Sequence, residues 1–293
     1  MKYAYFPGCT LHTQADNFRL SCDASCRELG LELAELQSWE CCGAVFPLST
    51  DNRLPLASPF RTLARAHATG QPLLTLCSAC YNVLKRTNYT VSGNAEVREK
   101  LEAFVELPYA GQGRVVHLLE AIRDDLGWGA LRARVKRPLS GLPVAAYYGC
   151  LLLRPQEELQ FDDPENPRVL EELVSALGAK PVLYPHRAEC CGAYLGVRDS
   201  ESTLGAVRTI LQAAGARGAR VLVTSCPLCF YNLDSAQARI SQEDLAFKPL
   251  PVLYFTQLLA LALGAPASQL VLSRHQVDPW PALQELGLGE VVA

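Results

Sequence analysis

Ten of the twelve cysteines in this 293-residue chain fall into two sets of five with the same order and similar spacing. Each set consists of a lone cysteine, an adjacent pair followed by glycine, and a Cys-x-x-Cys motif. In both sets 34 residues separate the pair from the motif, whereas the lone cysteine precedes the pair by 31 residues in the first set and by 39 in the second. The two sets are Cys9, Cys41, Cys42, Cys77 and Cys80, and Cys150, Cys190, Cys191, Cys226 and Cys229. Self-similarity of this kind indicates an internal duplication.

The duplication predicts two similar domains, residues 1–140 and residues 141–293, joined by the Pro- and Gly-containing stretch 137–143. In each half an apolar run leads to the lone cysteine, a helix-like segment follows the pair, and a second apolar run leads into the Cys-x-x-Cys motif. These elements are expected at residues 2–6, 55–69, 73–76, 144–148, 202–217 and 221–224, with further helices beginning near Tyr81 and Phe230. Strands alternating with helices predict two Rossmann-like α/β domains, related by a pseudo-two-fold axis.

Composition excludes several classes of function. The charged fraction is 19% and the formal net charge is −3, so no basic surface for nucleic acid is expected. The first residues lack the pattern of an export signal. The apolar run 252–265 is shorter than the ~20 residues of a membrane span and is expected to be a core helix. We therefore expect a cytoplasmic protein without direct membrane insertion.

A cytoplasmic location makes the cysteines candidates for metal or redox chemistry, because disulfides are rare in reducing compartments. A thioredoxin-like dithiol would use one Cys-x-x-Cys and leave three cysteines of each half unexplained. Structural zinc would take four ligands, and zinc in one half stays open as a minor alternative. An iron–sulfur cluster accepts thiolate ligands and is favoured. A Cys-x-x-Cys at the start of a helix would also have its thiolates stabilised by the helix dipole.

The adjacent cysteines indicate an unusual geometry. Neighbouring side chains on an extended backbone point to opposite sides, so both thiols reach one cluster only if the chain turns sharply between them. Gly43 and Gly192, which follow the two pairs, permit such a turn. Five thiolates also exceed the four that a cubane cluster takes, which predicts either another cluster geometry or a cube with one free thiol.

Other residues near the two sets carry weaker signals. Cys22 and Cys26 have no counterparts in the second half and are expected to be packing residues of a helix. His12 and His186 lie within four residues of a site cysteine and are the candidates for proton transfer, although a surface or capping role is the simpler interpretation. The acidic stretch 155–167 is expected to be a surface loop, with a lid over the second cluster or a docking surface as the alternative.

The cysteine pattern resembles the cysteine-rich CCG-domain family. Together with the start Tyr5-Phe6-Pro7-Gly8-Cys9, it is most similar to the B subunit of heterodisulfide reductase. The resemblance covers nearly the whole chain. It implies that each set of five cysteines binds one noncubane [4Fe-4S] cluster, so that all ten would be metal and cofactor ligands. No cysteine of the family pattern is missing from this sequence.

The resemblance also implies an activity, that of an oxidoreductase acting on a sulfur group. Such a protein reduces a small-molecule disulfide by two electrons, one from each cluster. The implied partners are the ferredoxin-like iron–sulfur protein and the flavin-containing protein that form the other subunits of the same complex. Two alternatives stay open. One is a relay subunit of a lactate, glycolate or glycerol-phosphate oxidising system, which shares the same ligands, and the other is a zinc-stabilised interaction module.

Overall fold

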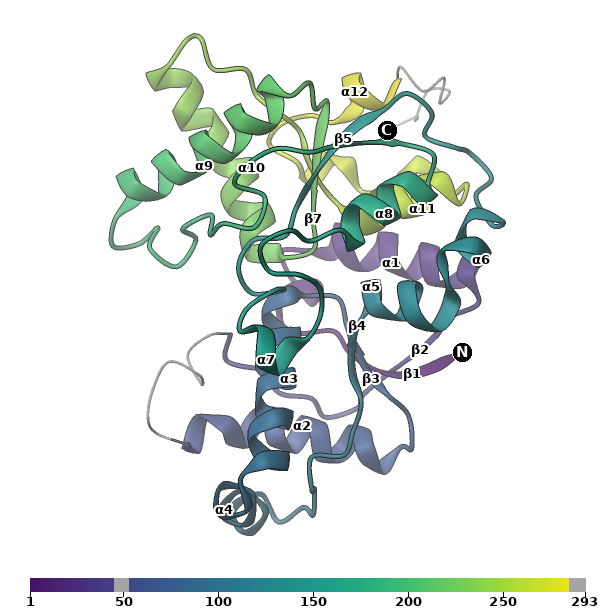
Figure 1. Cartoon of the computed structure of the whole chain (residues 1–293), viewed down its shortest axis with the longest axis vertical. Coiled ribbons are helices and arrows are strands. Elements are labelled where there is room, and N and C mark those ends of the chain that lie inside the picture. The colour runs from purple at the N-terminus through teal and green to yellow at the C-terminus, as the bar shows by residue number, and fades with distance from the viewer. Residues whose placement is uncertain (45–52, 285–293) are drawn as a thin grey trace.

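The computed structural model describes residues 1–44 and 53–284, and within them the strands form two parallel four-stranded sheets (Figure 1). The first sheet has the order β2-β1-β3-β4, with β1 (Lys2–Phe6), β2 (Glu32–Glu35), β3 (Leu73–Thr75) and β4 (Val115–His117). The second has the order β6-β5-β7-β8, with β5 (Pro143–Tyr147), β6 (Lys180–Val182), β7 (Val221–Thr224) and β8 (Val252–Tyr254). The same order in both halves confirms the predicted duplicated α/β architecture.

Helices connect the strands and pack on both sheets. In the first half these are α1 (Asp16–Leu29), α2 (Ala57–Ala68), α3 (Ser78–Gly93), α4 (Ala95–Val105), α5 (Leu118–Glu120), the π-helical segment η4 (Ala121–Leu126) and α6 (Trp128–Arg132). In the second half they are α7 (Gln156–Leu159), α8 (Val169–Ala176), α9 (Ser200–Ala216), α10 (Pro227–Glu243), α11 (Phe255–Ala262) and α12 (Trp280–Gln284). Short 3-10 turns include η1 (Thr10–His12) and η6 (Leu272–Arg274).

Helix α1 shows how the sequence builds one of these elements. Phe18, Cys22, Cys26 and Leu29 recur at the three- and four-residue spacing of one helix face, and all four are buried. The helix ends at Gly30, whose φ of +69° is the left-handed conformation that favours glycine. The cysteines outside the two sets are therefore core residues, as predicted.

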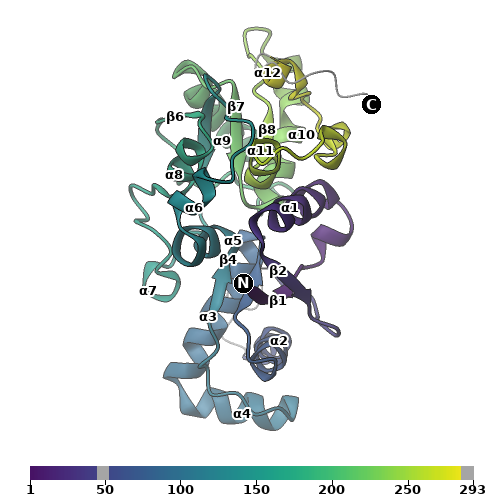
Figure 2. The same ribbon diagram turned by 90° about the vertical axis from the view of Figure 1, so that its right-hand side faces the viewer.

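The two halves share an apolar interface. Helix α1 of the first half lies against α11 of the second, which Figures 1 and 2 both show. The ring of Phe18 stacks on Tyr254 with centroids 4.1 Å apart, and Tyr254 stacks on Phe230 at 4.3 Å. The Ser21 and Thr256 hydroxyls form a buried hydrogen bond of 2.7 Å. Stacked rings and buried hydrogen bonds across the halves hold their relative placement.

The predicted domain boundary at residues 140 and 141 falls between α6 and β5 and stays a prediction. The chain just before it already contacts the second half, because the backbone N–H groups of Lys136 and Arg137 both donate to the carbonyl of Ala262. A cut at this position would break those hydrogen bonds.

Two expectations from the sequence were wrong in detail. The apolar run 252–265 is not one helix, because Val252–Tyr254 is the edge strand β8 and α11 begins at Phe255. A short apolar run bounded by turns does not by itself distinguish a buried strand from a buried helix. The helices of the Cys-x-x-Cys motifs also begin earlier than expected, at Ser78 and Pro227. Proline is well suited to a first helical position, since it has no N–H to leave unpaired.

Candidate metal centre

The cysteine loops lie at the carboxyl ends of the central strands. In the first sheet β1 and β3 are neighbours whose onward connections lead to opposite edges, to β2 and to β4. Cys9 follows β1 and Cys77 follows β3, while in the second sheet Cys150 follows β5 and Cys226 follows β7. The crevice at such a reversal of strand order is the usual ligand site of an open parallel sheet. The fold therefore brings both sets to that place.

Two of these cysteines begin helices. Cys77 is the N-cap residue of α3 and Cys226 that of α10, both with extended backbone. Cys80 and Cys229 follow in the first turns of the same helices. The free N–H groups and the positive end of each helix dipole stabilise thiolates and negatively charged groups there. The predicted junction of strand and helix at each motif is confirmed.

The first set is arranged as linked sulfur contacts. The Sγ of Cys41 lies 3.7 Å from that of Cys9, and the Sγ of Cys42 lies 3.5 Å from that of Cys80. The thiols of Cys77 and Cys80 are in hydrogen-bonding contact. The adjacent pair is thus divided: its first cysteine joins the lone cysteine, and its second joins the Cys-x-x-Cys motif.

The second set repeats this division. Cys190 and the lone Cys150 are close enough to shift each other's pKa, and the Sγ of Cys191 lies 3.7 Å from that of Cys229. Cys226 contacts Cys229 in turn. Equivalent residues therefore make equivalent contacts in both halves, although the loops before the two pairs differ in length.

A glycine turn shapes each adjacent pair. Gly43 and Gly192 both have a φ of +78°, the left-handed conformation. Their backbone N–H groups point back to the first sulfur of the pair, at 3.4 Å from the Sγ of Cys41 and of Cys190. The chain reverses just after the two cysteines, so both side chains remain on the inside of one loop.

The two sets lie beside each other. The thiols of Cys77 and Cys226 are close enough across the two halves for each to shift the pKa of the other, upward for Cys77 and downward for Cys226. Beside them the hydroxyls of Ser78 and Ser225 form a hydrogen bond of 2.8 Å, and the backbone N–H of Ser78 donates to the carbonyl of Ser225 at 3.2 Å. The N-termini of α3 and α10 therefore meet, and the two sets of cysteines lie next to each other.

The crowded thiols change one another's acidity. The Cys150 S–H donates to the sulfur of Cys190 and lowers the pKa of Cys190 to about 6. The same contact, together with burial, raises the pKa of Cys150. Contacts with Cys229 and Cys77 lower the pKa of Cys226. In each contact one sulfur becomes a thiolate because its neighbour keeps a proton, so full ionisation of the group requires cations among the sulfurs.

The site fits an iron–sulfur group on two counts. All donors of the two sets are sulfur, the ligand that iron–sulfur clusters take. Gly8 and Gly149 also leave room, since a Cβ at Gly8 would lie 2.8 Å from the Sγ of Cys80 and one at Gly149 would lie 3.1 Å from that of Cys229.

The two candidate histidines are engaged with carboxylates. His12 lies 3.1 Å from the Oε1 of Glu35 and stacks on the ring of Trp39. The Nδ1 of His186 lies 2.9 Å from the Oε1 of Glu189. Their role in proton transfer therefore stays a prediction, and the structure supplies each with another partner.

A residue pair near the site escaped the sequence analysis. His117, the last residue of β4, is the N-cap residue of α5, and Tyr254, the last residue of β8, is that of α11. The backbone N–H of each is capped three residues later, by the side chains of Glu120 and Gln257. Burial lowers the pKa of His117 to about 4, and its Nε2 lies 2.7 Å from the carbonyl of Leu76, just before Cys77. The sequence signal that could have revealed this pair is the similarity of residues 115–120 and 252–257, each two apolar residues and a ring residue followed three positions later by Glu or Gln.

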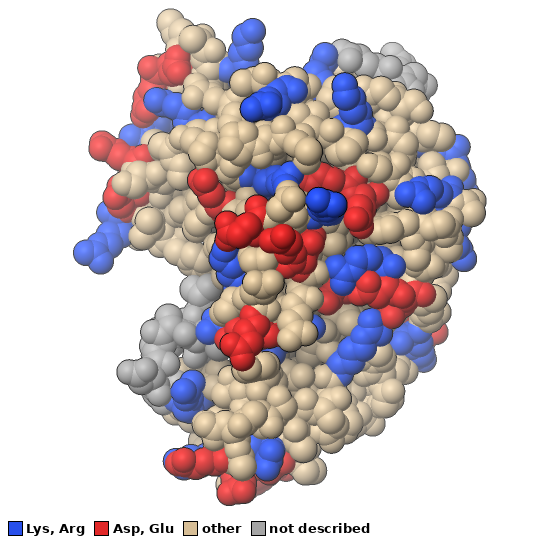
Figure 3. All heavy atoms as spheres, viewed as in Figure 1, with Lys and Arg blue, Asp and Glu red and all other residues tan. Residues whose placement is uncertain are grey.

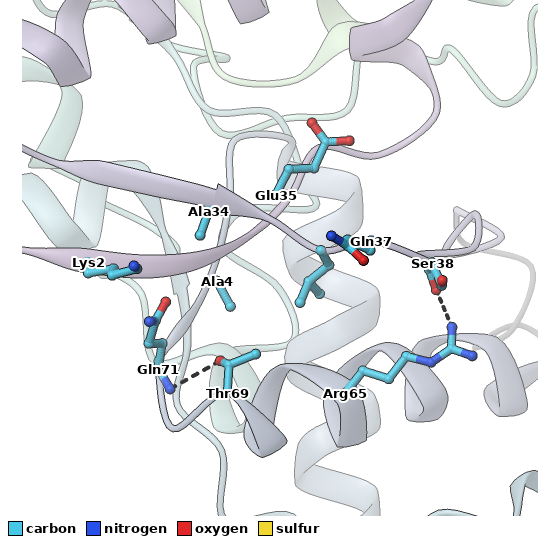
Figure 4. A pocket seen from close by; sticks show the side chains of 10 residues that line it. Lys2, Ala4, Ala34, Glu35, Gln37, Ser38, Arg65, Thr69 and Gln71 are labelled. Carbon is cyan, nitrogen blue, oxygen red and sulfur yellow. Dashed lines mark hydrogen bonds between the residues drawn. The ribbon is translucent and has the colours of Figure 1, made fainter.

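One further cavity, of about 430 Å³, lies at the edge of the first sheet (Figure 4). It is lined by β1, β2 and the end of α2, with Arg65 donating to the carbonyl of Ser38 on one side. None of the ten cysteines lines it, so we do not assign it to the metal centre.

The pattern now has a counterpart among known proteins. A family model described as a cysteine-rich domain, CCG, matches residues 3–85 and 144–234. These segments contain all ten cysteines and span more than half of the chain. The chain belongs to the cysteine-rich CCG-domain family. The resemblance inferred from the sequence is confirmed.

Relatives of this CCG protein extend over almost its whole length. It is 34% identical to the 8-methylmenaquinol:fumarate reductase membrane anchor subunit of Wolinella succinogenes, over 94% of this chain and 97% of that one. It is 31% identical to a protein of Archaeoglobus profundus named as similar to the B subunit of heterodisulfide reductase, over 90% and 91%. It is 29% identical to the B subunit of the ferredoxin/F420H2-dependent CoB-CoM heterodisulfide reductase of Methanosarcina acetivorans, over 94% of each.

A solved structure shares the fold. A hypothetical protein from Helicobacter pylori matches with a TM-score of 0.74 and 16% identity, over 94% of this chain and 51% of that one. This chain thus spans about half the length of that protein. Family and relatives together support an iron–sulfur, electron-transferring role in an oxidoreductase. None of the helices in the described parts of the chain combines the length and apolarity needed to cross a bilayer.

Proposed function

We propose that this CCG protein holds two iron–sulfur clusters, one on each set of five cysteines, and passes two electrons to a disulfide within a heterodisulfide-reductase-like complex. The observation that carries the proposal is the meeting of the two Cys-x-x-Cys motifs, where Ser78, next to Cys77, hydrogen-bonds Ser225, next to Cys226. It sets two ligand groups side by side at one crevice. Cleavage of a disulfide takes two electrons, which matches two adjacent one-electron carriers.

Each part of the chain has a defined task in this proposal. When bound, two noncubane [4Fe-4S] clusters would supply one electron each to the sulfurs of a disulfide. The N-termini of α3 and α10 favour the negative charge of thiolate-ligated iron through their N–H groups. Gly8 and Gly149 let the backbone approach the sulfurs of Cys80 and Cys229. Burial of the Cys-x-x-Cys sulfurs keeps water from them.

Partners and location follow from the same proposal. Electrons would come from the ferredoxin-like iron–sulfur partner, fed by the flavin-containing partner, in the cytoplasm. Residues 1–140 and 141–293 would be the two cluster-binding domains. The relatives whose names refer to the B subunit of heterodisulfide reductase support this arrangement.

A second candidate function uses the same ligands. The relative from Wolinella is named as part of an 8-methylmenaquinol:fumarate reductase and is 34% identical over 97% of its length. This supports an electron relay in which a quinol, and not a disulfide, is the small-molecule partner. The zinc-stabilised interaction module remains a third possibility that metal analysis tests.

Metal content tests the core of the proposal. Anaerobically purified protein is expected to contain about eight irons per chain, the content of two four-iron clusters. Zinc in place of iron would contradict the redox function. Turnover with a disulfide or with a quinone as the acceptor, using the same reduced protein, would separate the two electron-transfer functions.

Spectroscopy of variants tests the cluster type. Cys42→Ala and Cys191→Ala each remove one sulfur of an adjacent pair, so each is expected to change the electron paramagnetic resonance signal of one cluster. Cys22→Ala is the matched control, because Cys22 is buried in α1 outside both sets. Unchanged signals in both pair variants would contradict five-ligand, noncubane clusters.

A further inference from the structure

A cavity of about 450 Å³ runs along the outer face of α10, within the size range of small-molecule sites. One wall comes from α10, with Leu228 and Tyr231. The opposite wall comes from the segment after Cys9, with Gln14, and from the segment near η6, with Ser273 and Gln276. Residues from three distant parts of the chain thus enclose one space between the halves.

The position of this α10 pocket ties it to both cysteine sets. Thr10, which lines it, directly follows Cys9 of the first set. Pro227 and Leu228, which also line it, lie between Cys226 and Cys229 of the second set. A molecule in the pocket would be next to ligand loops of both clusters. No other part of our proposed function uses this space.

The matching face of the duplicated helix in the first half is covered by the second half. There α7, within the acidic stretch 155–167, packs on α3, and Asn82 donates to the carbonyls of Leu151 and Arg154 at 2.8 and 2.7 Å. Asn82 is 1% exposed, whereas Tyr231, its counterpart in the repeat, is 71% exposed. The inserted stretch therefore fills one of two equivalent places and leaves the other open. Its α7 packs on the first half, whereas Glu165 and Asn166 bond Arg154 and Arg187 of the second half, and a lid over the second cluster stays a prediction.

The charged side chains that line the α10 pocket already have partners within the chain. Asp234 is buried, and its two carboxylate oxygens accept the backbone N–H groups of Gln276 and Val277 at 2.7 and 3.1 Å. Arg274 at the mouth pairs with Asp16 at 3.0 Å. Figure 3 shows acidic and basic side chains interspersed on the face of Figure 1. An uncharged ligand suits such a pocket better than an anion.

The other residues that line the α10 pocket favour a ligand with a flat ring. Tyr254 and Phe230 line the floor and form, with Phe18, a stack of three rings with centroids 4.1 and 4.3 Å apart. The side chains of Gln14, Ser273 and Gln276 are exposed, and no hydrogen bond engages them within the described residues. Aromatic walls with free amide and hydroxyl groups bind rings that carry oxygen acceptors.

We propose that the α10 pocket binds an uncharged small molecule with a flat, oxygen-bearing ring. Because this rests on the electron-transfer function proposed above, the molecule is the small electron partner of the two clusters in the relay form of that function. Reduction of a quinone of this class to a hydroquinone takes two electrons and two protons. The clusters that the two cysteine sets would hold would supply one electron each, and water would supply the protons.

Calorimetric titration of menadione into the anaerobically purified, cluster-loaded chain tests the proposal. Ser273→Trp fills the mouth of the pocket, and we expect it to weaken binding by roughly tenfold or more. Tyr231→Ala removes an aromatic wall and is expected to weaken binding by roughly threefold to tenfold. Leu245→Ala is the control, because Leu245 is 95% exposed and lies beyond the pocket. All three sites are exposed, so folding is not at risk.

The outcomes separate this proposal from the function on which it rests. No menadione binding, or equal binding in wild type and Ser273→Trp, overturns the pocket even when iron content and spectra are those of two clusters. Loss of co-purifying proteins in Ser273→Trp with unchanged menadione binding would assign the pocket to a partner polypeptide and also overturn it. Absence of iron would instead contradict the electron-transfer function, while the titration would still test binding to the pocket.

Discussion

Replacement of Gly8 by alanine tests whether the close approach of backbone and sulfur matters for cluster binding. Gly8 has a φ of +77°, and a Cβ there would lie 2.8 Å from the Sγ of Cys80. Gly30 provides a matched control, because its φ is +69° and a Cβ there would meet no atom within 4 Å. The two variants share the same backbone strain and differ in the clash with a cysteine.

The expected magnitudes follow from that comparison. Alanine in the left-handed conformation costs about 1–2 kcal/mol of stability, and both variants should show this loss. Real Cβ atoms are essentially never found under 3.0 Å from another heavy atom, so in Gly8→Ala the sulfur of Cys80 must move by several tenths of an ångström. A displaced ligand should release the first cluster, which takes the iron content from about eight to about four per chain.

Iron analysis measures cluster loss in both variants, and urea unfolding measures their loss of stability. Gly30→Ala is expected to lose stability and keep its iron. Gly149→Ala, whose Cβ would lie 3.1 Å from the Sγ of Cys229, should fall between the other two in iron content. If Gly8→Ala retained full iron and wild-type spectra, the reasoning that the glycine makes room for a ligand sulfur would be refuted.

Two further predictions concern stability. Phe18→Ala should cost about 3–5 kcal/mol in urea unfolding, because the buried ring stacks on Tyr254 across the two halves, while exposed Phe104→Ala should change little. Burial, opposed by the Leu272 carbonyl, lowers the pKa of His275 to about 4. The folded protein therefore binds fewer protons than the unfolded chain between pH 4 and 6.5, and stability present above pH 6.5 should fall by up to ~3 kcal/mol toward pH 4. His275→Gln should remove that part of the pH slope, and an unchanged slope would contradict the assignment.

Much of the fold was readable because the repeat is strong. The strands before the lone cysteines and before the Cys-x-x-Cys motifs were predicted at nearly their observed positions, since each is a short apolar run with a glycine or cysteine after it. The edge strand β8 was missed because three apolar residues followed by a buried helix look like one helix. Only pairing with β7 distinguishes the two, and pairing is not a local property.

The candidate site was likewise predictable from the sequence only in part. Spacing alone placed the ten cysteines in two sets, and the resemblance implies that they are ligands. It did not reveal that the two sets lie side by side, next to Ser78 and Ser225, which are far apart in the sequence. That arrangement involves the packing of α1 against α11 and the Ser78–Ser225 hydrogen bond. Long-range contacts of this kind leave no periodic signal in the chain.

The sequence by itself determined the chemistry of this CCG protein: the thiol donors, their duplication, and the glycines that let the chain turn beside them. These depend on residue type and on short-range geometry. Tertiary structure decided where the two halves meet and which of two equivalent helix faces stays open. Helix α7 of the acidic stretch 155–167 packs on α3, whereas Tyr231 on the matching face of α10 stays exposed, because the insertion after Cys150 has no counterpart after Cys9. Which face is covered depends on where the inserted stretch packs, and not on its composition.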